Sequence, residues 1–205
     1  MPLGLLPLAG YLLGSIPFGY LIVRFTKGTD VRGAGSGNIG ATNVNRVAGA
    51  GAALATLLLD MAKGYCAVLL ADRVSGGQIG LMALSGLAAV AGHLFPVWLR
   101  FRGGKGVATA VGVFVPLCWM GVAAAAVVWL VVVSIWRYVS LASVVTAAAL
   151  PVAMYFLYAP GTRHAPPLTV SFSTAMVAIL IIIKHRDNIG RLLAGTESRL
   201  KFGGR

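Results

Sequence analysis

Long apolar stretches separated by short polar segments dominate this chain. The apolar stretches cover residues 3–23, 47–71, 79–99, 107–136, 138–158 and 168–183. Each is close to or longer than the roughly 17–25 residues that a helix needs to cross a bilayer. The pattern predicts an all-α, polytopic integral membrane protein, with residues 1–205 forming a single transmembrane domain.

The fourth stretch, 107–136, is too long for one straight crossing. A helix of that length would extend about 45 Å at 1.5 Å per residue, whereas the hydrocarbon core is about 30 Å thick. If the chain turns near 115–117 and returns, fourteen Lys and Arg residues lie on one side of the membrane, and only Arg73 and Arg163 on the other. A single crossing divides them eight to eight.

Cytoplasmic loops are enriched in Lys and Arg, so the returning path is favoured. It predicts seven transmembrane helices, with the N-terminus outside and the C-terminus in the cytoplasm. Five spans plus a re-entrant pair of helices would give the same orientation and is the alternative. The first stretch has no basic residues before it, so it is expected to be a retained helix rather than a signal peptide.

The composition agrees with a membrane protein and limits its partners. Of the 205 residues, 58% are hydrophobic and 11% are charged, and the formal net charge is +12. The basic residues lie in short gaps between apolar stretches, which indicates membrane orientation and anionic lipid or phosphate ligands rather than nucleic acid. Cys66 and Cys118 are the only cysteines. They provide neither a disulfide framework nor a metal site, and no cofactor is expected.

The first polar segment, 32–46, has the composition of a phosphate-binding loop. Its glycines allow positive φ and close backbone approach, and its short polar side chains provide hydrogen-bond donors. These residues are Gly33, Gly35, Ser36, Gly37, Asn38, Gly40, Thr42, Asn43 and Arg46. The spacing of Gly35, Gly37 and Gly40 matches a dinucleotide fingerprint, but the segment follows a membrane span rather than a β-strand, so that interpretation is rejected. A flexible cytoplasmic loop is the alternative.

The second segment, 100–109, predicts another anion site. Gly103, Gly104, Lys105 and Gly106 immediately precede an apolar helix, whose free N–H groups and positive dipole end favour a phosphate beside the lysine. The segment is not a Walker A loop, because Gly106 follows the lysine where that motif has Ser or Thr.

The third segment, 184–199, contains polar groups that could hold a hydroxyl-bearing substrate. They are His185, Asn188 and Glu197, the only glutamate in the chain. A basic tail that contacts anionic lipid is the alternative. Ser143, in the short polar stretch 137–143, could bind a ligand or hydrogen-bond to its own helix.

Two further features lie within the apolar stretches. Asp60 and Lys63 are three residues apart, so they share a helix face and can form an ion pair. A structural pair is the preferred interpretation, and support for the first polar segment is the functional one. His93 could be a buried imidazole with satisfied hydrogen bonds or a catalytic one.

In order and spacing, six strings of this sequence resemble the bacterial acylphosphate-dependent glycerol-3-phosphate acyltransferases, the PlsY family. They are GSIPFGYLIVR, GSGNIGATNVNR, LLDMAKG, GHLFPVWLRFRGGKGVAT, RYVSLAS and KHRDNIGRLLAGTESR. The resemblance covers nearly the whole chain. One departure is Arg102, where a lysine is common in the family.

The resemblance implies transfer of a fatty acyl group from acyl phosphate to the 1-hydroxyl of sn-glycerol 3-phosphate, which gives lysophosphatidic acid and phosphate. It implies a phosphate clamp for the donor, with the glycines 103, 104 and 106 in its second loop and Thr109 near it; the clamp residues are Ser36, Gly37, Asn38, Thr42, Arg46 and Lys105. His185, Asn188, Ser143 and Glu197 would hold glycerol 3-phosphate, and either His185 or the donor phosphate would accept the proton. The catalytic residues would be His185, Lys105 and Ser36.

These expectations place the enzyme in the bacterial inner membrane, with its active site on the cytoplasmic face. Its partners would be the two substrates and membrane lipid, without nucleic acid or an obligate protein partner. The competing hypothesis is an organophosphate or phospholipid transporter that uses the same basic, glycine-rich site. Carriers commonly contain inverted repeats, and neither glycine-rich loop occurs twice in this chain.

Overall fold

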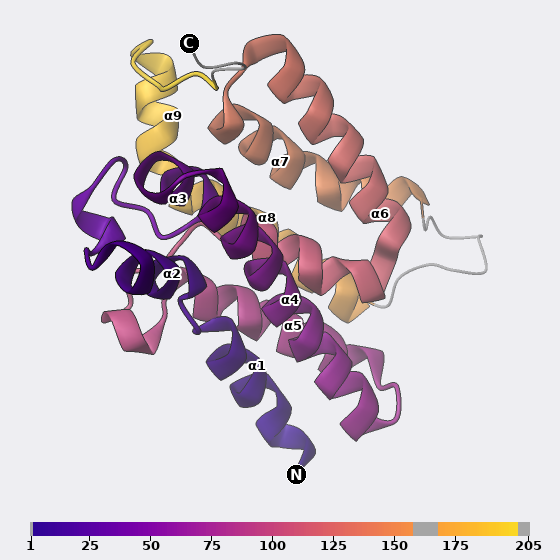
Figure 1. The fold of residues 1–205 in the computed structure, drawn as a ribbon. Helices are drawn as coiled ribbons and strands as arrows, with labels where there is room; N and C mark the ends of the chain where they lie inside the picture. The colour runs from indigo at the N-terminus through magenta and orange to yellow at the C-terminus, as the bar shows by residue number, and fades with distance from the viewer. Residues whose placement is uncertain (1, 158–167, 201–205) are drawn as a thin grey trace. The chain divides into compact units, whose positions relative to one another are not determined.

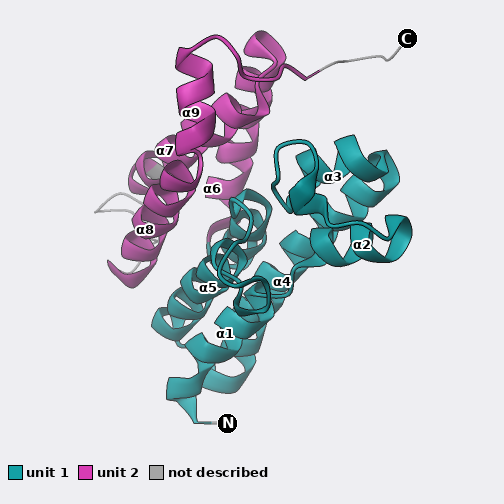
Figure 2. Ribbon diagram, turned by 90° about the vertical axis from the view of Figure 1, so that its left-hand side faces the viewer, with its two compact units in different colours: residues 1–117 teal, residues 118–205 magenta. Residues whose placement is uncertain are grey.

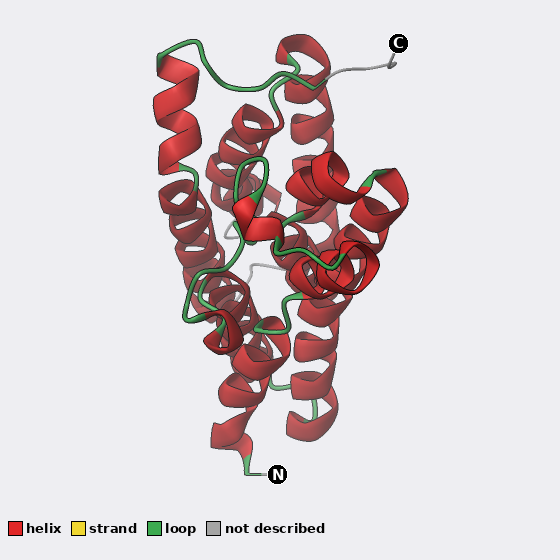
Figure 3. Cartoon of the chain, turned by 60° about the vertical axis from the view of Figure 1, so that its left-hand side comes forward, coloured by secondary structure: helices red, strands yellow, loops and turns green. Residues whose placement is uncertain are grey.

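Long apolar helices make up most of the described part of the chain. The computed structural model describes residues 2–157 and 168–200. Within these ranges every regular element is a helix (Figures 1 and 3). The helices are α1 (Leu6–Gly14), α2 (Phe18–Lys27), α3 (Ala41–Ala48), α4 (Ala50–Ser75), α5 (Ile79–Leu94), α6 (Val107–Trp136), α7 (Val139–Leu157), α8 (Leu168–Lys184) and α9 (Arg186–Leu193), with short 3₁₀ turns at Leu3–Leu5, Val31–Gly33 and Val97–Leu99. The predicted all-α fold is confirmed.

Five of the described segments are long and apolar enough to cross a membrane. They are Leu3–Lys27, Ala50–Ser75, Ile79–Leu99, Val107–Trp136 and Val139–Phe156. A sixth is added if α8 and α9, which meet at a bend of 55°, are one span. Each lies on an apolar stretch predicted from the sequence. Seven helices and the sidedness of the termini remain predictions, and Arg163, Lys201 and Arg205 of the charge count lie outside the described residues.

The chain divides into two compact units, coloured separately in Figure 2. Unit 1 is Met1–Leu117 and unit 2 is Cys118–Arg205. The boundary falls inside α6, where Cys118 has non-helical backbone angles (φ −162°, ψ 68°). Pro116 lies two residues earlier, and a proline inside a helix removes one backbone hydrogen bond and clashes with the preceding turn. The sequence predicted a break at 115–117, and the structure has one beside it.

Glycines allow the helices of unit 1 to pack closely. A Cβ on Gly10 or Gly14 of α1 would collide with the carbonyl oxygens of Ser85 and Ala89 on α5. In a bilayer, lipid is as apolar as the helix surface, so close van der Waals packing between small residues drives helix association.

The first half of α6 packs against α4 in the same way. A Cβ on Gly64 would collide with the carbonyl oxygen of Thr109, and one on Gly112 with that of Met61. The start of α6 is therefore fixed relative to the middle of α4, and this fixes the loop that leads into α6.

Unit 2 contains the second half of α6 with α7, α8 and α9. Its buried cluster of Val132, Val133 and Ala142 lies where α6 ends and α7 begins, and Leu200 of the C-terminal tail packs against it. The backbone N–H of Leu200 donates to the carbonyl of Arg137 at 2.6 Å. The tail is thus anchored to the α6–α7 turn.

Candidate functional site

Asn43 organises the first predicted loop. This buried side chain at the start of α3 donates from Nδ2 to the carbonyls of Val31 (3.2 Å), Ala34 (3.0 Å) and Asn38 (2.9 Å). Its Oδ1 accepts a hydrogen bond of 2.8 Å from the backbone N–H of Ser36. One amide therefore holds both sides of the loop, so residues 32–46 form an ordered structure rather than a flexible connection.

The predicted ligands of this loop lie around that amide. Gly35 and Gly37 have positive φ (59° and 70°), which bends the backbone on both sides of the exposed Ser36. Asn38 accepts from the N–H of Gly40 at 2.7 Å. Its side chain therefore shapes the loop in addition to any role with a ligand.

Thr42 and Arg46 are exposed at the two ends of the short helix that follows, α3. Thr42 lies in the first turn, where the backbone N–H groups lack partners within the helix, and Arg46 lies in the last turn.

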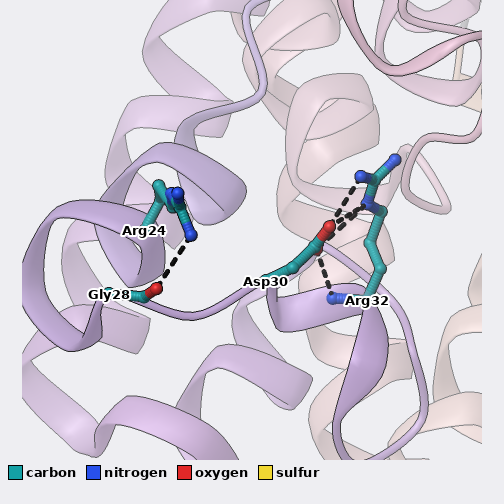
Figure 4. Close-up of polar contacts among 4 residues, drawn as sticks. All are labelled: Arg24, Gly28, Asp30 and Arg32. Atoms are coloured by element: carbon teal, nitrogen blue, oxygen red, sulfur yellow. Dashed lines mark hydrogen bonds and ion pairs between the residues drawn. The ribbon is translucent and has the colours of Figure 1, made fainter.

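Arg32, the first residue of the segment, is committed to a neighbouring carboxylate. Its guanidinium makes a bidentate pair with Asp30, with Nη2 at 2.6 Å from Oδ2 and Nε at 3.0 Å from Oδ1 (Figure 4). The hydrogen bond from Arg32 lowers the pKa of Asp30 below its ordinary value. Arg24 donates to the carbonyl of Gly28 at 2.8 Å, at the C-terminal end of α2. Both arginines shape the turn before the loop.

The second loop lies directly on the end of α5. The N–H of Gly104 donates to the carbonyl of His93 at 3.0 Å. A Cβ on Gly103 would collide with the same carbonyl oxygen and with Pro96, and one on Gly106 with the side chain of Leu94. Gly106 also has positive φ (84°), and its carbonyl accepts from Ala110 at 2.8 Å as the first bond of α6. Residues 103, 104 and 106 must be glycine for this loop to contact the end of α5. Lys105 is the only one of the four residues 103–106 that has a side chain.

Thr109, on the first turn of α6, is fully buried, and its hydroxyl has no hydrogen-bond partner among the described residues. It lies three residues after Gly106, where the helix N–H groups are not used within the helix. The start of α6 therefore combines backbone donors, a buried hydroxyl and the Lys105 cation, which is a suitable set for an anion.

In unit 2, His185 precedes α9 and is buried. Its Nδ1 lies 2.8 Å from the carbonyl oxygen of Ile181. A carbonyl only accepts, so Nδ1 carries a proton, and in the neutral form of the ring the lone pair is on Nε2. This is the tautomer that a general base requires.

Glu197 connects the C-terminal tail to α7 and α9. Its Oε1 accepts from Asn188 at 2.6 Å and from Ser140 at 2.7 Å, and its Oε2 accepts from Arg191 at 2.7 Å. Partial burial acts to raise the pKa of Glu197, but the hydrogen bonds from Asn188, Ser140 and Arg191 outweigh it and hold the pKa below its ordinary value. Glu197 is therefore an ionised carboxylate at neutral pH.

Ser143 has local partners. Its hydroxyl donates to the carbonyl of Val139 at 2.8 Å, and the indole N–H of Trp129 lies 3.4 Å from its oxygen. Ser140, one turn earlier, contacts Glu197 instead, and Arg199 donates to the hydroxyl of Tyr138 at 3.0 Å.

The structure groups the predicted residues by unit. Unit 1 contains Ser36, Gly37, Asn38, Thr42, Arg46, Gly103, Gly104, Lys105, Gly106 and Thr109, and unit 2 contains Ser143, His185, Asn188 and Glu197. The structural roles of two residues, Asn43 and Ser140, were not predicted from the sequence. Asn43 was grouped with the donors although it organises the loop, and Ser140 was passed over although it lies in the same polar stretch as Ser143. No group of three His, Cys, Asp or Glu side chains that could hold a metal occurs within 2–157 and 168–200.

Known proteins match this chain over almost its full length. The family model described as glycerol-3-phosphate acyltransferase matches residues 4–195. A glycerol-3-phosphate acyltransferase of Mesorhizobium japonicum is 50% identical over 191 residues, which are 93% of this chain and 92% of the relative. One of Desulforudis audaxviator is 50% identical over 192 residues, which are 94% and 92%.

Two solved structures are similar in fold. Both are crystal structures of PlsY (YgiH), an integral membrane glycerol 3-phosphate acyltransferase. The glycerol 3-phosphate form has a TM-score of 0.87 and 41% identity, and covers 99% of this chain and 96% of its own. The lysophosphatidic acid form has a TM-score of 0.84 and 40% identity with the same coverage.

Proposed function

Since this chain belongs to the glycerol-3-phosphate acyltransferase family, we propose that its polar loops bind the two substrates of that reaction. The protein is an integral membrane enzyme that acylates glycerol 3-phosphate. The proposed donor is acyl phosphate. The acyl group moves to the 1-hydroxyl of sn-glycerol 3-phosphate, and the products are lysophosphatidic acid and inorganic phosphate.

Unit 1 binds the phosphate of the donor. This assignment rests on the close contact between residues 103–106 and the end of α5. The contact places Lys105 just before the first turn of α6. Cationic and backbone donors at a helix N-terminus favour a phosphate. The clamp residues are Ser36, Gly37, Asn38, Thr42, Arg46 and Lys105. Gly103, Gly104 and Gly106 form its second loop, and Thr109 lies near it.

Unit 2 binds glycerol 3-phosphate, the ligand of one of the related crystal structures. The binding residues are His185, Asn188, Ser143 and Glu197. The contact between Asn188 and Glu197 supports this grouping, because it fixes an amide on α9, the short helix that His185 precedes.

The transfer needs no acylated side chain. Acyl phosphate is a mixed anhydride and is already activated, so the enzyme aligns the reactants and neutralises the departing phosphate. The glycerol hydroxyl oxygen forms the new ester bond as the bond from the acyl carbon to the phosphate oxygen breaks. The hydroxyl proton goes to Nε2 of His185 or to the departing phosphate.

The proposed topology follows the charge distribution. The enzyme has seven transmembrane helices in the bacterial inner membrane, the N-terminus outside, and its C-terminus and active site at the cytoplasmic face. The non-helical backbone at Cys118 supports a division of the long fourth stretch into two helices. Both units act as one acyltransferase domain that requires its substrates and membrane lipid but no obligate protein partner.

Purified protein in a lipidic mesophase provides the direct test. With acyl phosphate and glycerol 3-phosphate it should release inorganic phosphate and form lysophosphatidic acid in equal amounts, and acyl-CoA or acyl carrier protein should not replace the donor. The competing transporter would instead move an organophosphate across vesicles without releasing phosphate. Absence of phosphate release with both substrates present would contradict the proposed function.

A further inference from the structure

Three titratable side chains lie together in the interior of unit 1, outside the proposed clamp. Asp60 and Lys63 are on α4 and His93 is on α5. The Nζ atom of Lys63 is 2.8 Å from Oδ1 of Asp60 and 2.9 Å from Nδ1 of His93, and Nδ1 is 3.5 Å from the same carboxylate oxygen. Their side chains are only 2–4% exposed. Burying charged groups inside a membrane protein is costly, so such a cluster calls for a function.

Lys63 contacts both other members of the cluster and a backbone carbonyl. Lys63 also donates to the carbonyl of Ile16 at 2.8 Å, so its ammonium group has a carboxylate oxygen, a ring nitrogen and a backbone carbonyl within 2.9 Å.

His93 connects this cluster to the second loop. Its carbonyl accepts the N–H of Gly104, and its imidazole lies where a Cβ on Gly104 would be. The three atoms nearest to the position of that Cβ are Nε2, Cε1 and Cδ2 of His93, so the ring occupies the space that a side chain at residue 104 would need. Lys105 is the next residue along the chain.

We propose that Asp60, Lys63 and His93 are positioning residues for Lys105. The ion pair fixes the His93 ring, the ring and carbonyl fix Gly104, and Gly104 fixes the backbone from which Lys105 and α6 begin. The inference rests on the proposed function, in which Lys105 binds the phosphate of the donor. Preorganisation of this kind acts on donor binding and leaves the acceptor site in unit 2 unaffected.

The test separates this role from a purely structural one by comparing Michaelis constants. Asp60→Asn removes the countercharge. His93→Asn keeps an acceptor for Lys63 in the place of Nδ1 but removes the ring edge against Gly104. It leaves the Asp60–Lys63 pair in place, so it serves as the test if Asp60→Asn does not fold. Each variant should raise the KM for acyl phosphate at least tenfold and change the KM for glycerol 3-phosphate less than threefold. The matched control is Ser85→Ala, because Ser85 is a buried polar residue on α5, the helix of His93. It should change neither Michaelis constant.

A double variant tests the contact itself. Gly104→Ala alone should raise the KM for acyl phosphate at least tenfold, because its methyl group collides with the His93 ring. In Gly104→Ala/His93→Asn the methyl group occupies the space that the ring has left, and at least threefold of the loss should be recovered. A structural role alone gives no such recovery.

The outcomes distinguish this inference from the function on which it rests. If Lys105→Ala raises the KM for acyl phosphate while Asp60→Asn and His93→Asn lower only the yield of folded protein or kcat, the positioning role is wrong and the clamp stands. Failure of the double variant to improve on Gly104→Ala would also overturn it. If Lys105→Ala leaves that KM unchanged, the clamp itself is wrong.

Discussion

The side-chain amide of Asn188 donates a hydrogen bond of 2.6 Å to the carboxylate of Glu197, nine residues further along the chain. The same carboxylate accepts from Ser140 on α7 and from Arg191 on α9. Asn188 is buried, and the side chain of Glu197 is 8% exposed. A single ionised group in the tail therefore orients an amide of the proposed acceptor site.

Replacing Glu197 should affect the acceptor substrate selectively. Glu197→Ala leaves the donors of Asn188 and Ser140 without their acceptor, and a buried polar group without a partner costs about 1–3 kcal/mol. We expect the KM for glycerol 3-phosphate to rise about tenfold or more. Glu197→Gln retains a carbonyl oxygen for Asn188 and Ser140 but turns its NH2 toward the N–H of Arg191, so its effect should be smaller than that of Glu197→Ala. Steady-state kinetics with each substrate varied in turn would measure both effects, and an equal rise in the KM for acyl phosphate would contradict the assignment.

Glu197 should also give the folded protein an acid-dependent stability. A carboxyl whose pKa is lower in the folded protein than in the unfolded chain binds fewer protons when folded. Its contribution is complete above the ordinary pKa of glutamate and is lost as the pH falls through the lowered value. Thermal unfolding followed as a function of pH should therefore show a smaller acid loss in Glu197→Gln than in the wild type. An identical acid loss in both would place the effect at other groups.

The sequence was sufficient for those features that depend on residues close together in the chain. Hydropathy located the apolar helices, and Pro116 located the break now seen at Cys118. The glycines of the second loop were identified as a run beside Lys105. The reason for them was not predictable, because it is contact with the end of α5.

Contacts between distant residues were the features that the sequence could not provide. Ser140 and Glu197 are 57 positions apart, and Lys63 and His93 are 30 apart. Nothing in the local pattern distinguishes Ser140 from Ser143, since both lie in one short polar stretch. The pairing of Asp60 with Lys63 was predictable, because their spacing on a helix places them on one face.

Asn43→Asp should disorder the first loop without changing side-chain size. The carboxylate cannot donate, so the carbonyls of Val31, Ala34 and Asn38 would lose a donor and face a negative charge. We expect a loss of about 2–4 kcal/mol in stability and a rise in the KM for acyl phosphate. Thermal unfolding and kinetics would be compared with Asn45→Asp, an exposed residue on the same helix that should change neither by much. Equal behaviour of the two variants would remove Asn43 as the organiser of the loop.

Gly64→Ala should destabilise unit 1, because the new methyl group collides with the backbone carbonyl of Thr109 on α6. Overpacking of this kind costs about 1–3 kcal/mol. Gly51→Ala on the same helix is the control, since a Cβ there has no atom within 4 Å and alanine favours a helix. The melting temperature should fall for Gly64→Ala and stay the same or rise for Gly51→Ala. A similar change in both would mean that helix propensity, rather than packing of α4 on α6, determines the result.

Lys105→Ala should weaken binding of the donor. A charge-assisted hydrogen bond to phosphate contributes about 1.5–3 kcal/mol, so kcat/KM for acyl phosphate should fall by more than about tenfold. Lys105→Arg retains the charge with a different donor geometry and should recover part of the loss. Product inhibition by inorganic phosphate gives an independent measure, and should weaken in the same order. Unchanged inhibition in Lys105→Ala would place the phosphate elsewhere.

Two substitutions of His185 test whether its Nε2 accepts the proton of glycerol 3-phosphate. Asn at this position keeps a donor for the carbonyl of Ile181, as Nδ1 does now, but lacks the basic Nε2. If Nε2 accepts the proton of glycerol 3-phosphate, kcat should fall about 10²–10⁴-fold in His185→Asn and in His185→Gln, and the acid limb of the pH–rate profile should disappear. We expect this result, because the ring is held in the tautomer that a base requires. Turnover that stays within about tenfold of the wild type, with the acid limb intact, would instead show that the departing phosphate takes the proton and that the histidine only positions the acceptor.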